Sequence, residues 1–315
     1  MLADVLGASR PVTTAAPTAK SAVRHFLKID DLTNDEVLEL LDRASYLKQR
    51  RNVAPAAITP VEGRTVSLLF EKPSLRTRVS FEAAIRELGG ASTYLTKGDV
   101  GMGTRESVKD IASNLSRWSC AIVARLFWQR QIEELAANST VPVINALTEI
   151  EHPCQALADM MTVKENFGDE KIVIAYVGDA NNVARSLARL ATRLGYPFHL
   201  IGPQNFWLEP AEGLFQTSDL AEGLKSAQVV YTDVWISMGD EHEQEHRLKV
   251  FESYQVNPRV MAMADPDAIF LHCLPARRGY EVVDDVIDGP QSRVVDQAEN
   301  RLHVQKALLE KLLGL

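Results

Sequence analysis

Short apolar, β-rich runs alternate with amphipathic helical patterns along almost the whole chain. The runs are continuously apolar, which is typical of strands buried on both faces of a parallel sheet. The expected strands span residues 65–70, 120–127, 141–147, 171–178, 198–202, 227–235 and 268–275. Strands that alternate with helices in this way predict an α/β fold whose sheets are covered by helices on both faces. In such folds, ligands bind beyond the carboxyl ends of the strands, near helix N-termini.

The helical patterns and the chain length together predict two domains. A chain of 315 residues is long enough for two buried cores, and the polar, glycine-containing stretch 165–170 is the expected boundary. After the first three expected strands, helices are expected over residues 152–168, 182–195 and 298–313. The expected units are a flexible tail at 1–22, domains at 23–165 and 166–297, and a C-terminal helix at 298–315 that packs back on the first domain. Each domain should be doubly wound, with a central, mainly parallel sheet and the active site in the cleft between the domains.

Composition excludes several classes of partner. The net charge of −8 argues against a basic surface for nucleic acid or for an anionic membrane. Three cysteines without a C-x-x-C pair favour free thiols in a reducing compartment, and we expect a cytoplasmic protein. No apolar run reaches the ~18 residues of a membrane span. Residues 1–22 are rich in Ala, Thr, Ser and Pro with a single acid, Asp4, which favours a disordered tail over an organellar transit peptide.

The sequence "PSLRTR" follows the first expected strand and opens a helix. Ser74 is a suitable N-cap, and Arg76, Thr77 and Arg78 fall in the first helical turn. That turn exposes unpaired backbone N–H groups at the positive end of the helix dipole, where cations are unfavourable unless an anion joins them. An ordinary capped helix start with solvated arginines is the alternative. We favour a phosphate-binding site, because a guanidinium can grip two phosphate oxygens.

Two further polar positions follow buried strands in the first half of the chain. Arg125 ends an apolar strand and needs a partner, which could equally be a structural carboxylate or a ligand. His152 stands at a helix start, with Pro153 in the first helical position and Gln155 close behind. The positive end of the helix dipole favours a neutral imidazole that can donate one hydrogen bond to a carbonyl oxygen. A simple helix cap is the alternative for His152.

The second half of the chain places an acid and a thiol at strand ends. Asp233 lies in an apolar strand, so its carboxylate either pairs internally or awaits a cationic group of a substrate. Cys273 is either a small buried hydrophobe or a thiol in the cleft. Asn181 and Asn182 could cap a helix or present amides to a polar ligand. No nucleophile elbow accompanies these residues, so covalent catalysis is not indicated.

These motifs in this order resemble the transcarbamoylase family, and specifically its ornithine-binding branch. The S-x-R-T-R motif is present at residues 74–78 and the H-P-x-Q motif at 152–155. The D-x-x-x-S-M-G and H-C-L-P motifs are present at 233–239 and 272–275, and "AENR" at 298–301 also fits. The resemblance covers about residues 23–315. Five ordered motifs make a specific signal, whereas any one of them would be weak.

The resemblance implies transfer of a carbamoyl group from carbamoyl phosphate to the δ-amine of L-ornithine, a reaction of arginine metabolism that uses no cofactor and no metal. The residues that it assigns to carbamoyl phosphate are Ser74, Leu75, Arg76, Thr77, Arg125, His152, Gln155, Cys273, Leu274 and Arg301. The residues that it assigns to ornithine are Asn182, Asp233, Ser237 and Met238. Those that it implies in catalysis are Arg125, His152, Asp233 and Cys273. It also implies ordered binding, domain closure, and a homotrimer or multiple of trimers with sites near subunit interfaces.

Two positions depart from the family's pattern. Leu75 replaces the commoner threonine, which matters little if that residue binds through its backbone. Gly101 stands where members that use ornithine often carry a glutamine that reaches a neighbouring subunit's site, and Thr104 or Arg105 could substitute for it. The alternatives that stay open are a transcarbamoylase for another amine, such as putrescine or an N-acylated ornithine, and a catalytically silent homologue. The D-x-x-x-S-M-G loop argues against the other amines, and intact Arg76 and Asp233 argue against a silent homologue.

Overall fold

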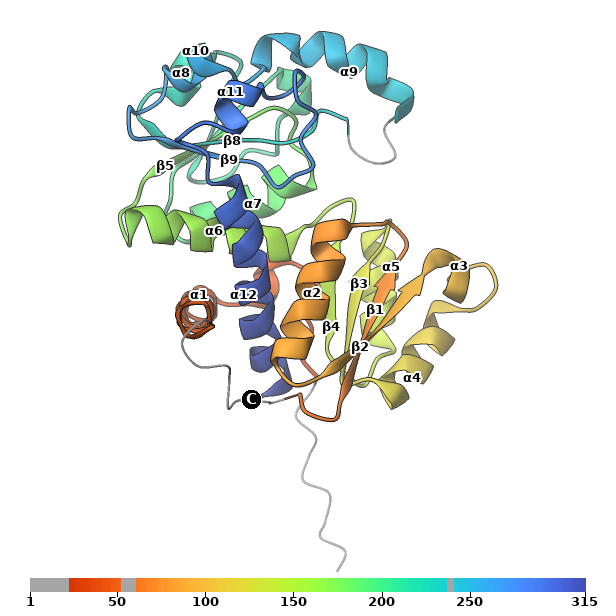
Figure 1. The fold of residues 1–315 in the computed structure, drawn as a ribbon. Coiled ribbons are helices and arrows are strands. Elements are labelled where there is room, and N and C mark those ends of the chain that lie inside the picture. The colour runs from red at the N-terminus through yellow and green to blue at the C-terminus, as the bar shows by residue number, and fades with distance from the viewer. Residues whose placement is uncertain (1–22, 52–60, 237–240) are drawn as a thin grey trace, which may run out of the picture.

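Two parallel sheets, each flanked by helices, form the fold, in agreement with the predicted α/β class (Figure 1). The computed structural model describes residues 23–51, 61–236 and 241–315. The tail at 1–22, for which we predicted flexibility, therefore lies outside the described residues. In the described part of the chain, no helix is both long enough and apolar enough to cross a membrane.

The first sheet has the parallel strand order β2-β1-β3-β4. Its strands are β1 (Thr65–Phe70), β2 (Ala91–Thr96), β3 (Ala121–Arg125) and β4 (Val143–Leu147). One face packs against α2 (Leu75–Glu87), in the same buried cluster as α1 (Asn34–Arg50), and the other packs against α4 (Val108–Trp118) and α5 (Gln129–Ala137). Residues of β1 alternate between these faces, since Val66 and Leu68 join the first core and Leu69 joins the second. The short α3 (Lys97–Val100) follows β2.

The second sheet has the parallel strand order β7-β6-β5-β8-β9. Its strands are β5 (Val173–Val177), β6 (Phe198–Ile201), β7 (Leu214–Thr217), β8 (Ala227–Thr232) and β9 (Ile269–Leu271). α6 (Pro153–Phe167) and α7 (Asn182–Arg193) cover one face. The helices on the other face are α8 (Leu220–Leu224), α9 (Gln244–Phe251), α10 (Pro258–Met261) and α11 (Asp284–Ile287). The 3-10 helices are η1 (Ile29–Asp31), η2 (Gln204–Phe206), η3 (Glu241–Glu243) and η4 (Glu252–Tyr254).

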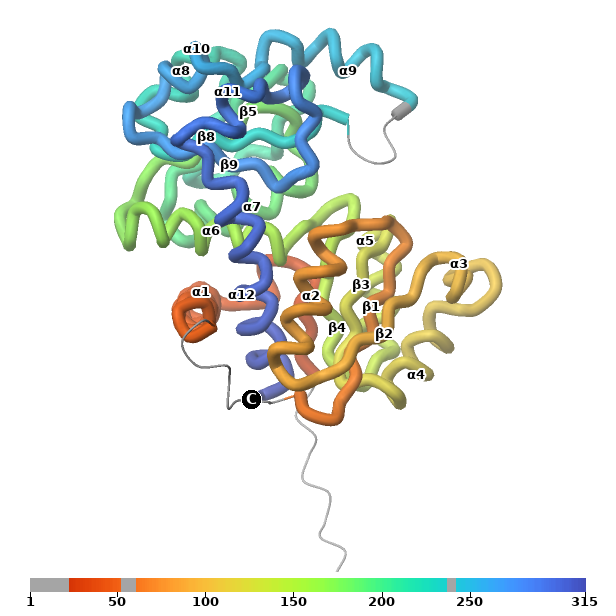
Figure 2. Tube along the Cα trace, viewed as in Figure 1, coloured from red at the N-terminus to blue at the C-terminus, as the bar shows by residue number. Residues whose placement is uncertain are grey.

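The last helix, α12 (Val294–Leu313), joins the two lobes. It starts beside β9 and runs down between α1 and α2, as the Cα trace shows (Figure 2). It packs on α1, α2 and α6, and its residues Val304, Ala307, Leu308, Leu309 and Leu312 belong to one buried cluster that extends from the first sheet to the second. The domain bounds given above stay a prediction, and the contacts of α12 with α1 and α2 support a C-terminal helix that returns to the first domain.

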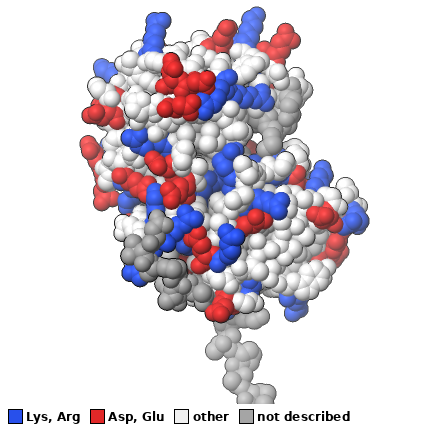
Figure 3. Space-filling model, viewed as in Figure 1, with Lys and Arg blue, Asp and Glu red and all other residues white. Residues whose placement is uncertain are grey.

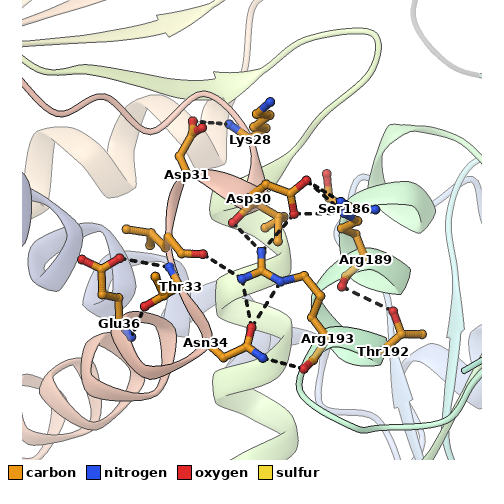
Figure 4. A network of polar contacts seen from close by, with 12 residues as sticks. Lys28, Asp30, Asp31, Thr33, Asn34, Glu36, Ser186, Arg189, Thr192 and Arg193 are labelled. Atoms are coloured by element: carbon orange, nitrogen blue, oxygen red, sulfur yellow. Dashed lines mark hydrogen bonds and ion pairs between the residues drawn. The ribbon is translucent and has the colours of Figure 1, made fainter. Parts of the chain in front are cut away.

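A network of ion pairs ties the segment before α1 to α7, across the two lobes (Figure 4). The guanidinium of Arg189 donates to Asp30 Oδ2 at 2.6 Å. The guanidinium of Arg193 donates to Asp30 Oδ1 at 3.0 Å and to the carbonyl oxygen of Leu32 at 2.8 Å. Arg193 also donates to Asn34 Oδ1 at 2.9 Å. Because the Arg193 guanidinium donates to both side-chain and backbone acceptors, these hydrogen bonds fix the orientation of α7 relative to the segment before α1, as well as the distance between them.

The structure differs from the prediction at the sheet edges. Strands β2 and β7 were not predicted, because edge strands are partly exposed and carry polar residues, as in "ASTYLT" of β2. β8 ends at Thr232 and β9 at Leu271, earlier than the predicted 235 and 275. Asp233 therefore follows its strand and does not lie within it, which corrects our prediction. Apolar residues that follow these strand ends pack in the hydrophobic core, but they do not pair with a neighbouring strand.

Candidate active site

A cavity of about 730 Å³ lies between the two lobes, at the carboxyl ends of the strands. Its walls come from the segments that follow β1, β4, β5, β8 and β9, from the end of β3, and from α12. In each sheet the strand order changes direction beside β1 and β5, and such switch points open a crevice for ligands. In Figure 3 the surface is hollowed between the two lobes on the right of the view, and Lys and Arg side chains gather there.

The cavity brings together most of the residues singled out in the sequence. The predicted residues that line it are Ser74, Leu75, Arg76, Thr77, Arg125, His152, Asn182, Asp233, Cys273, Leu274 and Arg301. Gln155 lies behind the cavity wall, where its Oε1 accepts a hydrogen bond of 2.7 Å from Arg301. Ser237 and Met238 lie outside the described residues.

The N-terminus of α2 forms one wall. Ser74 is the N-cap, as predicted, and its Oγ accepts a hydrogen bond from the backbone N–H of Thr77 at 3.3 Å. The Thr77 hydroxyl accepts a second hydrogen bond, of 3.0 Å, from the guanidinium of Arg301 on α12. The backbone N–H groups of the first turn and the helix dipole therefore point toward the same space as the Arg301 side chain.

Three guanidinium groups converge on this wall of the cavity. Arg125 and Arg301 are almost fully buried, and the Nε atom of each lacks a hydrogen-bond partner among the described residues. Burial, and next the charge of Arg301, lower the pKa of Arg125 to about 9. Burial also lowers the pKa of Arg76 and that of Arg301. Buried cations with unused donors are unfavourable alone, so this wall is built to receive an anion.

His152 presents a neutral imidazole to the cavity. It is the residue before the first turn of α6, and its backbone N–H donates to Ser186 Oγ at 2.9 Å. Burial, and then the charges of Arg301 and Arg125, hold the pKa of His152 well below its usual range. The neutral state agrees with our prediction, but its main causes are burial and guanidinium charge. Its Nδ1 atom is buried and has no partner among the described residues.

An acid and a thiol form the opposite wall. Asp233 accepts a hydrogen bond from the Cys273 thiol at 3.1 Å and another from Asn181 Nδ2 at 2.8 Å. The backbone N–H of Val234 donates to the same carboxylate at 2.8 Å. Burial, and then the Asp233 charge, raise the pKa of Cys273 well above its usual range, so the thiol stays protonated and acts as a donor. A carboxylate held in this way can accept hydrogen bonds from an amine, and the thiol is a poor nucleophile.

The residues on this side offer an incomplete metal site. Donor atoms of Asp233, His272 and Cys273 lie within 4.8 Å of one another. However, His272 Nδ1 accepts a hydrogen bond from the backbone N–H of Leu274 at 2.8 Å, and its Nε2 lies 3.2 Å from Glu281 Oε1. With both imidazole nitrogens engaged, Asp233 and Cys273 are left as donors, fewer than the three protein ligands of a catalytic zinc site.

Sequence reasoning missed several residues of the cavity. Asn181, which was named in the sequence, caps α7 by accepting from Val183 N at 2.9 Å, and its amide nitrogen donates to Asp233. The capping role is therefore confirmed. Asp179 pairs with Arg247 of α9 at 2.7 Å. Asp179 follows β5 directly, and the strand-end rule could have found it. Arg247 follows no strand, so no such signal exists for it.

The loop with the departure at Gly101 lies apart from the cavity walls of this chain. Gly101 ends α3 in the left-handed region, with φ of +63°, and a Cβ added there would lie 2.8 Å from Arg105 Cβ. A glutamine at this position would therefore be strained in this backbone conformation. The Thr104 hydroxyl donates to the carbonyl oxygen of Gly101 at 3.0 Å, and Arg105 donates to that of Asp99.

Comparisons with known proteins agree with this geometry. The family described as "Aspartate/ornithine carbamoyltransferase, carbamoyl-P binding domain" matches residues 24–165, and its "Asp/Orn binding domain" matches residues 170–312. The chain is 45% identical over 306 residues to an ornithine carbamoyltransferase of Methanopyrus kandleri, a match that covers 93% of this chain and 98% of the relative. A relative of the same name from Methanocaldococcus jannaschii is 44% identical over 303 residues, which cover 91% of this chain and 98% of the relative.

Solved structures give the same result. The ornithine carbamoyltransferase from Pyrococcus furiosus superposes with a TM-score of 0.88 at 43% identity, covering 93% of this chain and 98% of that one. The enzyme of the same name from Thermus thermophilus gives a TM-score of 0.84 at 42% identity, covering 92% and 99%. With both family domains matched in order and the cavity between them lined by the motif residues, the chain belongs to the aspartate/ornithine carbamoyltransferase family.

Proposed function

We propose that this chain transfers the carbamoyl group of carbamoyl phosphate to the δ-amine of L-ornithine, giving L-citrulline and phosphate. The proposal rests on the charges of the cavity walls, which are positive on one side and negative on the other. Arg76, Arg125 and Arg301 meet on one wall without a carboxylate partner among the described residues, and Asp233 with Cys273 forms the other. An anionic donor and an amine acceptor would thus be held facing each other, which is the requirement of a direct transfer.

The donor half needs charge stabilisation and no enzyme nucleophile, because phosphate is already a good leaving group. Ser74, the backbone of Leu75, Arg76 and Thr77 hold the phosphate group in our proposal. Arg125 and His152 donate to the carbonyl oxygen, where negative charge develops as the amine adds. Donors that are fixed before the reaction, in a site shielded from water, stabilise that charge most effectively.

The remaining groups complete the donor site. Gln155 supports Arg301 through the hydrogen bond of 2.7 Å, and Arg301 acts on the donor from α12. The backbone groups of Cys273 and Leu274 face the carbamoyl end from the second lobe. As phosphate departs, the guanidinium cluster compensates the charge that the breaking C–O bond leaves on it.

The acceptor half delivers an uncharged amine. The δ-nitrogen must lose a proton before its lone pair can form the new C–N bond, and burial lowers the pKa of an amine. Asp233 and Cys273 orient that nitrogen in our proposal, and Asn182 contacts the amino-acid end of ornithine. Ser237 and Met238, which lie outside the described residues, complete this contact by family resemblance. The amine proton leaves with the phosphate or to solvent, so no cofactor and no metal takes part.

Ornithine is favoured over the alternative amines. The matched family includes proteins for aspartate as well as ornithine, but the relatives at 44–46% identity are named for ornithine. A dicarboxylate would meet the Asp233 carboxylate, which repels it, whereas an amine is attracted to it. Putrescine lacks the carboxylate that the loop at 237–239 is proposed to contact.

We further propose a cytoplasmic homotrimer, or a multiple of trimers, with sites near subunit interfaces. Leu75 and Val79 on α2 support this proposal, because both side chains are mostly exposed and Leu75 lies at the edge of the cavity. The free thiols of Cys120, Cys154 and Cys273 support a reducing compartment. Light scattering on the eluting protein would give the mass of the assembly, and a monomer at working concentrations would contradict the trimer.

Citrulline formation measured by a colour assay tests the activity. Ornithine should give the highest kcat/KM, with putrescine, N-acetylornithine and aspartate compared as acceptors in the same assay. Arg76→Ala should lower kcat/KM by about a thousandfold or more, because a charged phosphate contact is lost in the transition state. The matched control is Arg78→Ala, since Arg78 lies in the same turn but pairs with Glu82 at 3.0 Å on the exposed side. Equal rates for Arg76→Ala and the unchanged protein would refute the phosphate assignment and favour a silent homologue or another site.

A further inference from the structure

A chain of buried polar side chains lies behind the cavity, between α6 and α12. Gln155 and Asp159 are on α6, Gln297 is on α12, and each is at most 1% exposed. Asp159 Oδ1 accepts a hydrogen bond of 2.8 Å from Gln155 Nε2 and another of 2.6 Å from Gln297 Nε2. None of the motifs in the sequence includes Asp159 or Gln297, and neither lines the cavity.

The direction of the hydrogen bonds is fixed at the phosphate end. A guanidinium has donors only, so the Arg301 group must give its hydrogen bond to the oxygen of Gln155, at 2.7 Å. The Gln155 amide nitrogen then points away from Arg301 and requires an acceptor. Asp159 supplies it. In turn Arg301, held in this way, donates to the Thr77 hydroxyl at the start of α2.

The direction is fixed at the amine end as well. The backbone N–H of His272 can only donate, and it does so to Gln297 Oε1 at 3.0 Å. The Gln297 amide nitrogen must therefore also find acceptors, and it donates to Asp159 and, at 3.1 Å, to the Tyr231 hydroxyl. His272 is followed by Cys273 and Leu274, and its imidazole accepts from the Leu274 N–H. Two chains of donors, one from each wall of the cavity, thus meet at a single carboxyl oxygen.

We propose that Asp159 is a positioning residue whose acceptor oxygen sets the amide orientations of Gln155 and Gln297, and so orients Arg301 and the turn at His272–Leu274. This inference rests on the function proposed above. Without an acceptor at this point, the Gln155 amide would bury an unsatisfied N–H or turn over, and the Gln297 amide would keep only the Tyr231 hydroxyl as its acceptor. A turned amide would direct its N–H toward Arg301 or toward the His272 N–H, and these contacts would be repulsive.

The role requires an acceptor oxygen and no negative charge. Asp159 Oδ2 is buried and makes no hydrogen bond with any described residue. Burial raises the pKa of Asp159 to about 7, so the surroundings disfavour the charged form relative to an exposed carboxylate. An asparagine keeps the acceptor oxygen and places its amide where Oδ2 now lies, whereas a leucine of similar size removes the acceptor.

Steady-state kinetics on Asp159→Asn and Asp159→Leu test the proposal, with Thr162→Val as the matched control. Thr162 lies one turn further along α6, is fully buried, and accepts a hydrogen bond of 2.9 Å from Asn300 of α12. Its replacement removes one buried hydrogen bond between the same two helices, but none that leads to the cavity. The thermal midpoint is measured for every variant, so that lost stability and lost positioning can be told apart.

We expect Asp159→Leu to raise the KM for carbamoyl phosphate and to lower kcat, with a loss of kcat/KM of about tenfold to a hundredfold. Asp159→Asn should stay within about threefold of the unchanged protein. Thr162→Val should lower the thermal midpoint and leave both kinetic constants unchanged. Gln297→Leu should raise the KM for carbamoyl phosphate less than Asp159→Leu does, because it breaks the branch to His272 and keeps the branch to Arg301.

Two results would overturn the inference. One is an Asp159→Leu protein that loses stability like Thr162→Val but keeps its kinetic constants. The other is an Asp159→Asn protein as impaired as Asp159→Leu, which would mean that charge matters and acceptor geometry does not. An unchanged protein that makes no citrulline would instead refute the proposed function. In that case the positioning role is tested by the rise in thermal midpoint that carbamoyl phosphate causes. Among these variants, only Asp159→Leu should lose that rise.

Discussion

Replacing Arg125 with methionine should stabilise the ligand-free protein and abolish its response to phosphate ligands. The Arg125 side chain is 6% exposed, and no carboxylate among the described residues pairs with it. Burial and the neighbouring Arg301 charge lower its pKa to about 9. Against an ordinary arginine pKa of about 12.5, and at about 1.4 kcal/mol per pKa unit, the charged form costs the empty fold up to about 5 kcal/mol. Methionine keeps much of the apolar volume and removes that charge.

The sign of the effect follows from the direction of the pKa change. A cation with a lowered pKa destabilises the folded state in full below pH 9, and the penalty fades as the pH rises toward the pKa of the unfolded chain. At pH 7 the whole penalty is present, so its removal should be visible there. If the substitution removes only a fifth of this penalty, about 1 kcal/mol, the thermal midpoint should rise by about 2 °C. A bound dianion should stabilise the unchanged protein by about 2.7 kcal/mol at a hundred times its Kd.

Thermal unfolding with and without saturating carbamoyl phosphate measures both effects. Arg125→Met should unfold at a higher temperature than the unchanged protein without ligand, and should gain almost nothing when ligand is added. Arg125→Lys keeps a buried charge and should show no such rise. Arg117→Met, at an exposed position on α4, controls for the substitution itself. A lower midpoint for ligand-free Arg125→Met, together with normal protection by ligand, would refute the reasoning.

Three further results are expected. Asp233→Asn should lower kcat by about a thousandfold and change the KM for carbamoyl phosphate by less than about twofold, because the charged acceptor of the amine is lost and the guanidinium wall is intact. Equal losses in both constants in the citrulline assay would contradict this. Because the pKa of Cys273 is raised, its thiol should react slowly with iodoacetamide between about pH 7 and 8 in the folded protein and quickly in urea, as followed by mass spectrometry. Because the pKa of His152 is held well below its usual range, kcat/KM for carbamoyl phosphate should show no histidine ionisation between about pH 6 and 8, and a limb in that range that His152→Gln removes would count against it.

The sequence predicted the strands that are buried on both faces, because such burial leaves a continuously apolar pattern. β1, β3, β4 and β5 are almost wholly apolar, and each was found within two or three residues of its observed ends. The edge strands β2 and β7 were missed, since their partial exposure permits polar residues, whereas the edge strands β4 and β9 are buried and were found. The cavity lining was predicted well for a related reason. Polar groups directly after apolar strands stand out, and the carboxyl ends of parallel strands converge.

The supporting residues could not be predicted in the same way. Asp159 is a polar residue within a helical pattern and Gln297 directly precedes one, and nothing local distinguishes them from solvent-exposed positions. Their importance comes from a contact between residues 138 positions apart, which only the packing of α12 on α6 creates. The same holds for Arg247, which reaches Asp179 from a helix on the far side of the second sheet.

The path of α12 has a consequence for how the protein comes to be active. This helix follows every other described element in the chain, yet it covers apolar surface of α1, α2 and α6 and delivers Arg301 to the cavity. While a ribosome is still extruding residues 294–313, the first lobe exists with that surface open to solvent. Nascent chains should therefore attract chaperones at this stage and bind phosphate ligands weakly, because Arg301 is not yet in the cavity. Closure of the core and completion of the ligand site should then occur together.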